Sequence, residues 1–269
     1  MVLVLKKAKE IVTGPLEAGD TKIDVVDVGD LEQAPVQGGL GGHVGNPVAW
    51  QVALCNVSPL EVESPNLGDV GSGVMVQVRK ATLEDLVTIV DTAARSLDAE
   101  AMLRWSFGEE RFEERIRRHF TYSDGENALR GWIRVIDDGA GIAVWIPPGA
   151  REEYEAIGPA LPGAEAEILG NNAERHASFW GWVGEHEPPE PLLYLSHIGV
   201  VPQRQGEGLG SALMRDGLAQ GDQHRVPTWL ETSRVDNVAY YERFGFHTVV
   251  DEDAPDGGPH IWFMRRDPT

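Results

Sequence analysis

The segment from Ile198 to Met214 reads IGVVPQRQGEGLGSALM and joins three kinds of local sequence. An apolar, β-branched run (Leu192 to Val201) stops at Pro202, three glycines follow at alternate positions, and leucines then recur at helical spacing. This order predicts a strand, a tight loop and a helix. Such a loop directs several backbone N–H groups and the positive end of a helix dipole at one point in space. The segment therefore predicts a binding site for a phosphate or a pyrophosphate.

Two common phosphate-binding loops do not have this spacing. A Walker loop requires a lysine directly after its last glycine, and the chain has no lysine after Lys80. The dinucleotide loop requires Gly-x-Gly-x-x-Gly in an early βαβ unit, whereas these glycines are Gly206, Gly208 and Gly210, near the C-terminus. The pattern that matches is Gln-x-x-Gly-x-Gly, which begins at Gln205.

This loop resembles the acetyl-coenzyme-A loop of the GCN5-related N-acetyltransferases, the GNAT superfamily. A second block, NVAYYERFGF at residues 237–246, follows the strand-like PTWLET at residues 227–232. It is similar to the aromatic-rich helix of the family, whose tyrosine, matched here by Tyr241, commonly protonates the departing thiolate. The resemblance implies acetyl-CoA as co-substrate. The alternatives are a surface turn without a ligand and a tyrosine that only packs on its helix.

The resemblance also implies which residues contact acetyl-CoA. The strand that contains Tyr194 to Val200 would bind the pantetheine arm through its backbone, and one of its N–H groups would stabilise the oxyanion. The loop would hold the pyrophosphate. The expected coenzyme contacts are Ile198, Gly199, Val200, Gln205, Gly206, Glu207, Gly208, Leu209, Gly210, Ser211 and Asn237.

Two residues compete for the role of general base. Glu231 lies beside Trp229 on an expected strand, and apolar surroundings raise the pKa of a carboxyl group toward neutrality. Its alternative role is that of a structural carboxylate. His197 has a suitable intrinsic pKa. Strict alternation along its strand places His197 on the sheet face opposite Tyr194 and Ser196, and if the Tyr194 face points to the substrate, His197 is a core histidine.

Further segments resemble puromycin N-acetyltransferase and its relatives: AVW at 143–145, HEPPEP at 186–191 and GPHIWFMR at 258–265. This implies acetylation of a small-molecule amine, with antibiotics among the candidates. Acetylation of a protein or peptide and non-catalytic coenzyme-A sensing are the alternatives. His186 is expected to be a loop anchor or a substrate contact. The aromatic side chains expected near the acceptor, or in the core, are Trp105, Phe107, Tyr122, Phe179, Trp180 and Trp182.

Composition narrows the class of protein. The net charge of −20 argues against a nucleic-acid partner. A single cysteine, Cys55, excludes an internal disulfide and favours the cytoplasm. No signal peptide, transmembrane-length run or metal-ligand spacing is evident, so we expect neither a membrane partner nor a metal. The chain is compatible with a monomer or a homodimer.

The chain divides by composition near Met75. Residues 1–74 are rich in glycine, lack Phe, Tyr and Arg, and contain only two strand-like runs. We expect them to form a dispensable extension or a small accessory domain. Residues 75–269 are expected to form the acetyltransferase domain. Its first helix begins at Thr82, with Asp85 three residues later in a capping box.

From residue 75 onward the pattern alternates between strands and helices. Mixed strands with helices on both faces predict an α/β or α+β fold, and the resemblance implies a largely antiparallel GNAT-type sheet with a splayed central strand pair. Expected helices are 83–97, 109–120, the insert 151–185, the one after residue 208, and 238–244. Expected strands are 76–80, 131–136, 141–146 (joined by a turn at 137–139), 192–201, 228–232 and 260–265.

Overall fold

The computed structural model describes residues 76–136, 139–157 and 164–269. The expectations for residues 1–74, and the first two residues of the turn at 137–139, lie outside these ranges. None of the helices in the described ranges is long and apolar enough to cross a membrane.

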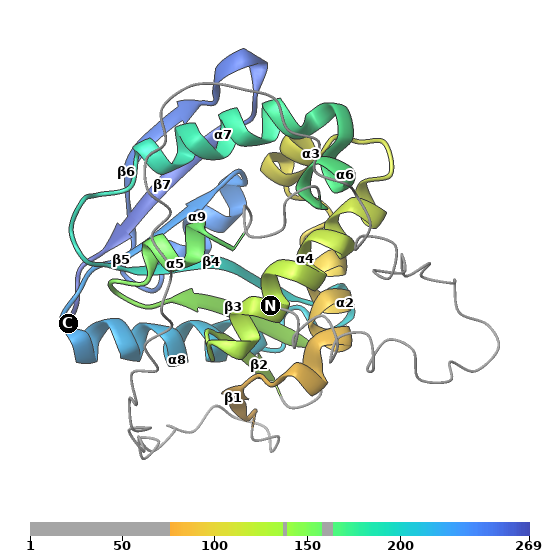
Figure 1. The fold of residues 1–269 in the computed structure, drawn as a ribbon. Coiled ribbons are helices and arrows are strands. Elements are labelled where there is room, and N and C mark those ends of the chain that lie inside the picture. The colour runs from red at the N-terminus through yellow and green to blue at the C-terminus, as the bar shows by residue number, and fades with distance from the viewer. Residues whose placement is uncertain (1–75, 137–138, 158–163) are drawn as a thin grey trace, which may run out of the picture. The chain divides into compact units, whose positions relative to one another are not determined.

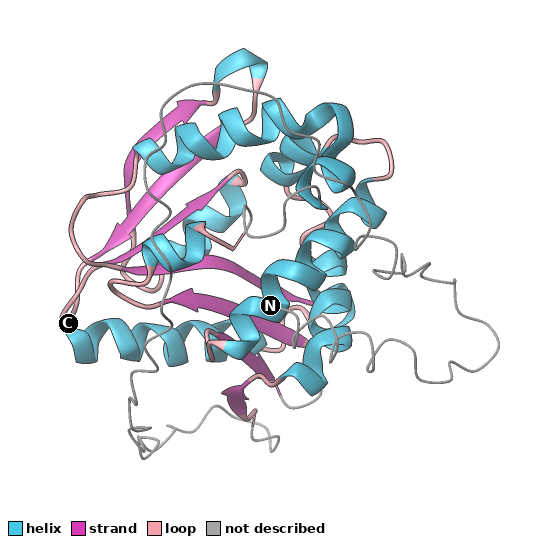
Figure 2. Cartoon of the chain, in the orientation of Figure 1, coloured by secondary structure: helices cyan, strands magenta, loops and turns pink. Residues whose placement is uncertain are grey.

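Seven strands form one sheet in the order β1-β2-β3-β4-β5-β7-β6 (Figure 2). Every neighbouring pair is antiparallel except β4 and β5, which are parallel. The sheet is therefore mixed and largely antiparallel, as predicted. The strands are β1 (Val78–Lys80), β2 (Ile133–Ile136), β3 (Gly141–Ile146), β4 (Leu193–Val200), β5 (Thr228–Thr232), β6 (His247–Asp253) and β7 (His260–Arg266).

Helices cover both faces of this sheet (Figure 1). Side chains alternate between the two faces along β3, so Val144 joins one buried cluster and its neighbour Trp145 joins the other. The first cluster includes residues of α2 (Leu86–Ser96), α3 (Ala101–Phe107), α4 (Phe112–Leu129), α6 (Ala164–Leu169) and α7 (Ala173–Glu185). The second includes residues of α8 (Leu209–His224) and α9 (Val235–Glu242). The short helix α5 (Arg151–Glu155) follows β3.

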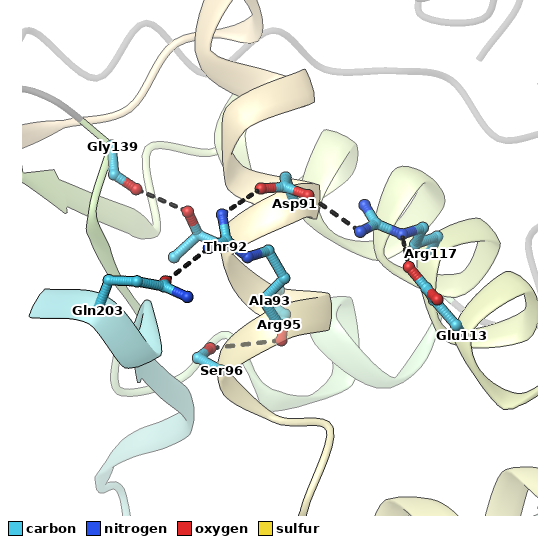
Figure 3. A network of polar contacts seen from close by, with 9 residues as sticks. All are labelled: Asp91, Thr92, Ala93, Arg95, Ser96, Glu113, Arg117, Gly139 and Gln203. Carbon is cyan, nitrogen blue, oxygen red and sulfur yellow. Dashed lines mark hydrogen bonds and ion pairs between the residues drawn. The ribbon is translucent and has the colours of Figure 1, made fainter. Parts of the chain in front are cut away.

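Polar contacts hold helix α2 at its N-terminus and in its second half. Thr82 and Asp85 form the predicted capping box just before it. Farther along, Thr92 donates a hydrogen bond of 2.6 Å to the carbonyl of Gly139, and Arg95 donates one of 2.6 Å to Gln203 (Figure 3). Gln203 belongs to the segment between β4 and α8, so the Arg95 bond connects α2 to the expected coenzyme loop.

Two parts of the predicted element order are wrong. The helix expected at 109–120 is α4, which begins at Phe112 and continues to Leu129, and the separate helix α3 before it was not predicted. A φ of +79° at Gly108 ends α3. The strand β6 was not predicted. It carries four acidic or histidine side chains in HTVVDED and is mostly exposed, which is typical of an edge strand protected against aggregation.

The central strands β4 and β5 pair over a short length. Leu193 pairs with Thr228 and Tyr194 with Trp229. Over the rest of these two described strands, β4 and β5 do not pair with each other. The expected splay is confirmed. Residues of β4 after Tyr194 and residues of β5 after Trp229 consequently have backbone groups available at the divergence of the two strands.

Candidate active site

A β-bulge lies at the centre of β4. Leu195 pairs with Trp145 and His197 pairs with Val144. Trp145 and Val144 are adjacent in β3, whereas Ser196 stands between their two partners, so Ser196 is the extra residue of the bulge. The bulge reverses the alternation, because His197 now shares the face of Val144 and Tyr194 rather than the face of Leu195. The prediction that His197 and Tyr194 lie on opposite faces is wrong for this reason.

His197 is mostly buried against α4. Its Nε2 lies 3.4 Å from Oδ2 of Asp124, a residue without solvent exposure, and its ring packs 5.0 Å from that of Phe120. Its Nδ1 is 3.3 Å from the hydroxyl of Ser196. These contacts agree with a core histidine, although the face on which it lies is not the predicted one. Asp124 was not singled out in the sequence, because no motif contains it.

The predicted coenzyme loop has the backbone conformation that its glycines permit. Gly206 and Gly208 both have φ of +84°, where an L side chain would be strained. Gly208 is the N-cap of α8, and the first intrahelical hydrogen bond runs from Ala212 N to Gly208 O at 3.0 Å. The N–H groups from Gly208 to Ser211 precede that bond and therefore have no intrahelical acceptor.

Neighbouring side chains order this loop. Gln205 donates a hydrogen bond of 3.1 Å to the carbonyl of Val200, the last residue of β4, and Glu207 accepts one of 2.6 Å from Arg204. Leu209 is buried against the sheet. A Cβ at Gly210 would lie 3.0 Å from the hydroxyl of Tyr240. The loop and α9 thus lie together, as the order of the two motifs predicted.

The end of β4 lies close to α2. A Cβ at Gly199 would be 1.9 Å from the hydroxyl oxygen of Ser96, so only glycine fits there. Ile198 and Val200 pack partly buried against the cluster that contains α8. The three residues predicted to contact the pantetheine arm therefore lie on the strand that leads into the glycine loop.

Glu231 lies on β5 two residues past its last pairing with β4. It pairs with Phe263 of β7 and lies on the sheet face of Trp229. Its Oε1 accepts a hydrogen bond of 2.6 Å from the hydroxyl of Tyr194. Burial raises the pKa of Glu231 to about 7, although the Tyr194 hydrogen bond and the charge of Arg151 act in the opposite direction. A carboxyl group with this pKa can accept a proton near neutral pH.

Tyr241 lies on the other face of the sheet. Its ring is buried with Leu209, Leu213 and Met264 in the cluster between the sheet and α8. Burial raises the pKa of Tyr241 well above its usual value, and the charges of Glu100 and Glu231 raise it further. The phenol consequently stays protonated at neutral pH, which a general acid requires.

Asn237 connects α9 to the segment between α2 and α3. Its amide nitrogen donates hydrogen bonds to Thr232 Oγ1 at 3.2 Å and to Glu100 Oε1 at 3.4 Å. The hydroxyl of Ser233 donates to the other oxygen of Glu100 at 3.2 Å. Burial raises the pKa of Glu100. The sequence analysis missed this second partly buried carboxylate, because Glu100 lies in a connection outside both motifs.

An open groove of about 540 Å³ is lined in part by the same connection. Ala99 and Ala101, which flank Glu100, line it together with Arg104, Trp105 and the segment 257–259 before β7. Arg175 also lines the groove and stacks 4.9 Å over the ring of Trp105.

Of the six aromatic residues expected near an acceptor, Trp105 lines this groove. Phe107 and Phe179 are buried in the core, and the other three pack partly buried against it: Tyr122, Trp180 and Trp182. His186 stacks at 4.3 Å on Phe263. Its ring nitrogens bond to the carbonyl of Trp182 at 2.9 Å and to Glu252 at 2.7 Å, contacts that agree with the expected loop anchor.

Known proteins share this architecture. A histone acetyltransferase HPA2 and related acetyltransferase from Corynebacterium glutamicum matches with a TM-score of 0.55 at 24% identity, over 73% of this chain and 98% of that chain. The C-terminal condensation domain of Ebony, in complex with beta-alanyl-dopamine, matches with a TM-score of 0.51 at 10% identity, over 72% of this chain and 100% of that one. At these identities both likenesses establish the fold alone.

A relative in sequence is an uncharacterized N-acetyltransferase of Schizosaccharomyces pombe. It is 26% identical over 147 residues, which are 51% of this chain and 60% of that protein. The chain therefore matches less than two thirds of the length of this curated relative.

The mixed sheet with its splayed central strand pair and the glycine loop are those expected of a GNAT-type fold. The model of the acetyltransferase (GNAT) family matches residues 99–246, more than half of the chain, and the chain belongs to this family. Acetyl-CoA is the co-substrate of the family.

Proposed function

We propose that this chain transfers the acetyl group of acetyl-CoA to an amine of a small molecule by direct attack. The observation that carries the proposal is the position of Glu231, a partly buried carboxylate with a pKa of about 7 at the divergence of β4 and β5. Tyr241 lies across the sheet from it with its proton retained. This pair supports a base for the incoming amine and an acid for the leaving sulfur.

In this proposal the coenzyme binds along β4 and at the start of α8. The N–H groups from Gly208 to Ser211 hold the pyrophosphate, with the other expected loop contacts around them. The backbone from Ile198 to Val200 carries the pantetheine arm and supplies the N–H that stabilises the oxyanion. Asn237 contacts the coenzyme, and its hydrogen bonds to Glu100 and Thr232 also hold α9 next to the connection between α2 and α3.

The chemistry then balances as a direct substitution at the carbonyl carbon. The amine nitrogen attacks the thioester, the C–N bond forms, and Glu231 takes one proton from that nitrogen. The C–S bond breaks, and Tyr241 gives its proton to the thiolate. Glu231 then releases its proton to water, and Tyr241 takes up a proton from water, so both side chains return to their starting states. The products are an N-acetylated amine and coenzyme A.

The resemblance to puromycin N-acetyltransferase and its relatives supports a small amine as the acceptor, with puromycin-like antibiotics as the class to test first. A role in antibiotic resistance would follow from such an acceptor. The single cysteine supports a cytoplasmic reaction. Trp105 at the groove supplies an aromatic face for an amphipathic amine.

Thiol release from acetyl-CoA tests the proposal against a panel of puromycin, polyamines, arylalkylamines and peptides with free N-termini. We expect amine-dependent release with a small molecule and an N-acetylated product of matching mass. Peptides as the only acceptors would point to protein acetylation instead. Tight coenzyme binding without release on any amine would contradict catalysis and favour a sensing role.

A further inference from the structure

The hydroxyl group of Tyr194 donates its hydrogen bond to Glu231 from the neighbouring strand. The two oxygens are 2.6 Å apart, a length typical of a hydroxyl bound to an ionised carboxylate. Tyr194 lies in the last residue pair that β4 and β5 share. The bond therefore joins the last paired residue of β4 to the residue of β5 that lies two positions past the end of their backbone pairing.

The ring of Tyr194 is held on several sides. It is 5% exposed, and the guanidinium of Arg151 lies 4.8 Å from its centroid. The ring of Tyr154 packs edge-on at 5.9 Å. Because α5 supplies both of these side chains, this short helix fixes the phenol that contacts Glu231.

Tyr154 makes a different contact with its own hydroxyl. That group is 2.7 Å from the hydroxyl of Ser196, the extra residue of the β4 bulge. Tyr194 and Tyr154 are therefore neighbouring phenols: the hydroxyl of Tyr194 binds Glu231, and that of Tyr154 binds Ser196 of the bulge. Removal of either hydroxyl by substitution with Phe therefore gives a test variant at Tyr194 and a matched control at Tyr154.

Charged groups approach Glu231 from several elements. Arg151 of α5 favours its ionised form, and Glu187, before β4, opposes it. Arg151 and Glu187 are 3.0 Å apart, and Arg151 also donates to Glu155 at 2.8 Å. On α9, Tyr241 interacts electrostatically with both Glu100 and Glu231. His186 stacks on Phe263, the residue of β7 that pairs with Glu231.

We infer that Tyr194 is a positioning residue that holds the Glu231 carboxylate at the divergence of β4 and β5 and sets the pH range in which it accepts a proton. This inference rests on the proposed function, in which Glu231 is the general base. A donor to an ionised carboxylate stabilises it relative to the acid, so the bond keeps Glu231 ionised at a lower pH than burial alone would permit. The bond also fixes the direction of the carboxylate toward the acceptor nitrogen.

Tyr194→Phe and Tyr154→Phe test this inference in the full chain, with the pH dependence of kcat/KM as the readout. Loss of the Tyr194 hydroxyl should move the acid limb upward by about one pH unit, the effect of one hydrogen bond to a charged group. It should also lower kcat, while KM for acetyl-CoA stays within twofold. Tyr154→Phe should leave the midpoint of the acid limb in place. An unmoved limb in Tyr194→Phe, or an equal movement in both variants, would overturn the inference.

Two further measurements make the outcome unambiguous. Incorporation of 3-fluorotyrosine at position 194 retains the packing and makes the phenol a stronger donor, so the acid limb should move downward. An upward or absent movement would contradict the inference even if Tyr194→Phe fails to fold. Glu231→Gln separates the two claims. If it keeps the wild-type rate and limb, the proposed base is wrong; if it removes the limb while Tyr194→Phe leaves it unmoved, only the role of Tyr194 fails.

Discussion

Glu231 and Tyr241 lie on opposite faces of the sheet, yet each is close enough for the charge of Glu231 to raise the pKa of Tyr241. Glu231 lies on the part of β5 that no longer pairs with β4. An acceptor from one face and a thioester from the other would meet at this divergence. Under the proposed function, the splay therefore separates the base from the acid while keeping both beside the reacting carbon.

Replacement of Glu231 by Gln should lower kcat/KM by about 10²-fold or more, because general-base catalysis commonly contributes this much. The amide retains the volume of the side chain but cannot take a proton from the amine. Since the pKa of Glu231 is about 7, the wild-type rate should fall below neutral pH, and that limb should be absent from the variant. Isothermal titration should give unchanged affinity for coenzyme A, and a variant with wild-type turnover would exclude Glu231 as the base.

Tyr241→Phe should lower kcat by about 10²-fold with little change in affinity for coenzyme A, because it removes only the proton for the thiolate. Tyr240→Phe serves as the matched control on the same helix, since its hydroxyl lies against Gly210 of the coenzyme loop. That variant should change coenzyme affinity more than kcat. Equal turnover of Tyr241→Phe and wild type at every pH would remove Tyr241 as the acid.

Gly208→Ala should weaken coenzyme binding roughly tenfold. A Cβ there meets nothing within 4 Å, so the effect comes from the φ of +84°, which costs about 1–2 kcal/mol for an L residue. Gly131→Ala is the control, since its φ of +71° imposes similar strain between α4 and β2. Both variants should unfold more easily, and only Gly208→Ala should raise the Kd. Equal Kd values in the two variants would mean that the coenzyme binds elsewhere.

The stability of the protein should fall on acidification below pH 6.5. Burial lowers the pKa of His119 to about 4 and that of His176 to about 3. Between pH 6.5 and these values the unfolded chain binds protons that the folded chain does not, which costs about 1 kcal/mol per pH unit for each histidine. Urea unfolding of His176→Gln should show a shallower decline than wild type, whereas the exposed control His224→Gln should not. Parallel curves for wild type and His176→Gln would contradict the assignment.

Much of the site could be predicted because its signals are local in the sequence. The spacing from Gln205 to Gly210 indicated the loop, and two of its glycines have the left-handed backbone that such a loop requires. The face of His197 could not be predicted, because a bulge at Ser196 depends on the register with β3 and leaves no local signal. Glu100 and Asp124 were missed for a related reason. Their partners, Asn237 and His197, are distant in the chain.

Initial-rate kinetics with acetyl-CoA and the amine varied together test the central claim of direct transfer most directly. If both substrates occupy the divergence of β4 and β5 at once, double-reciprocal plots should give intersecting lines. Protein incubated with acetyl-CoA alone should then keep its unmodified mass. Parallel lines, with an acetyl group retained on the protein before the amine is added, would contradict direct attack and require a covalent intermediate.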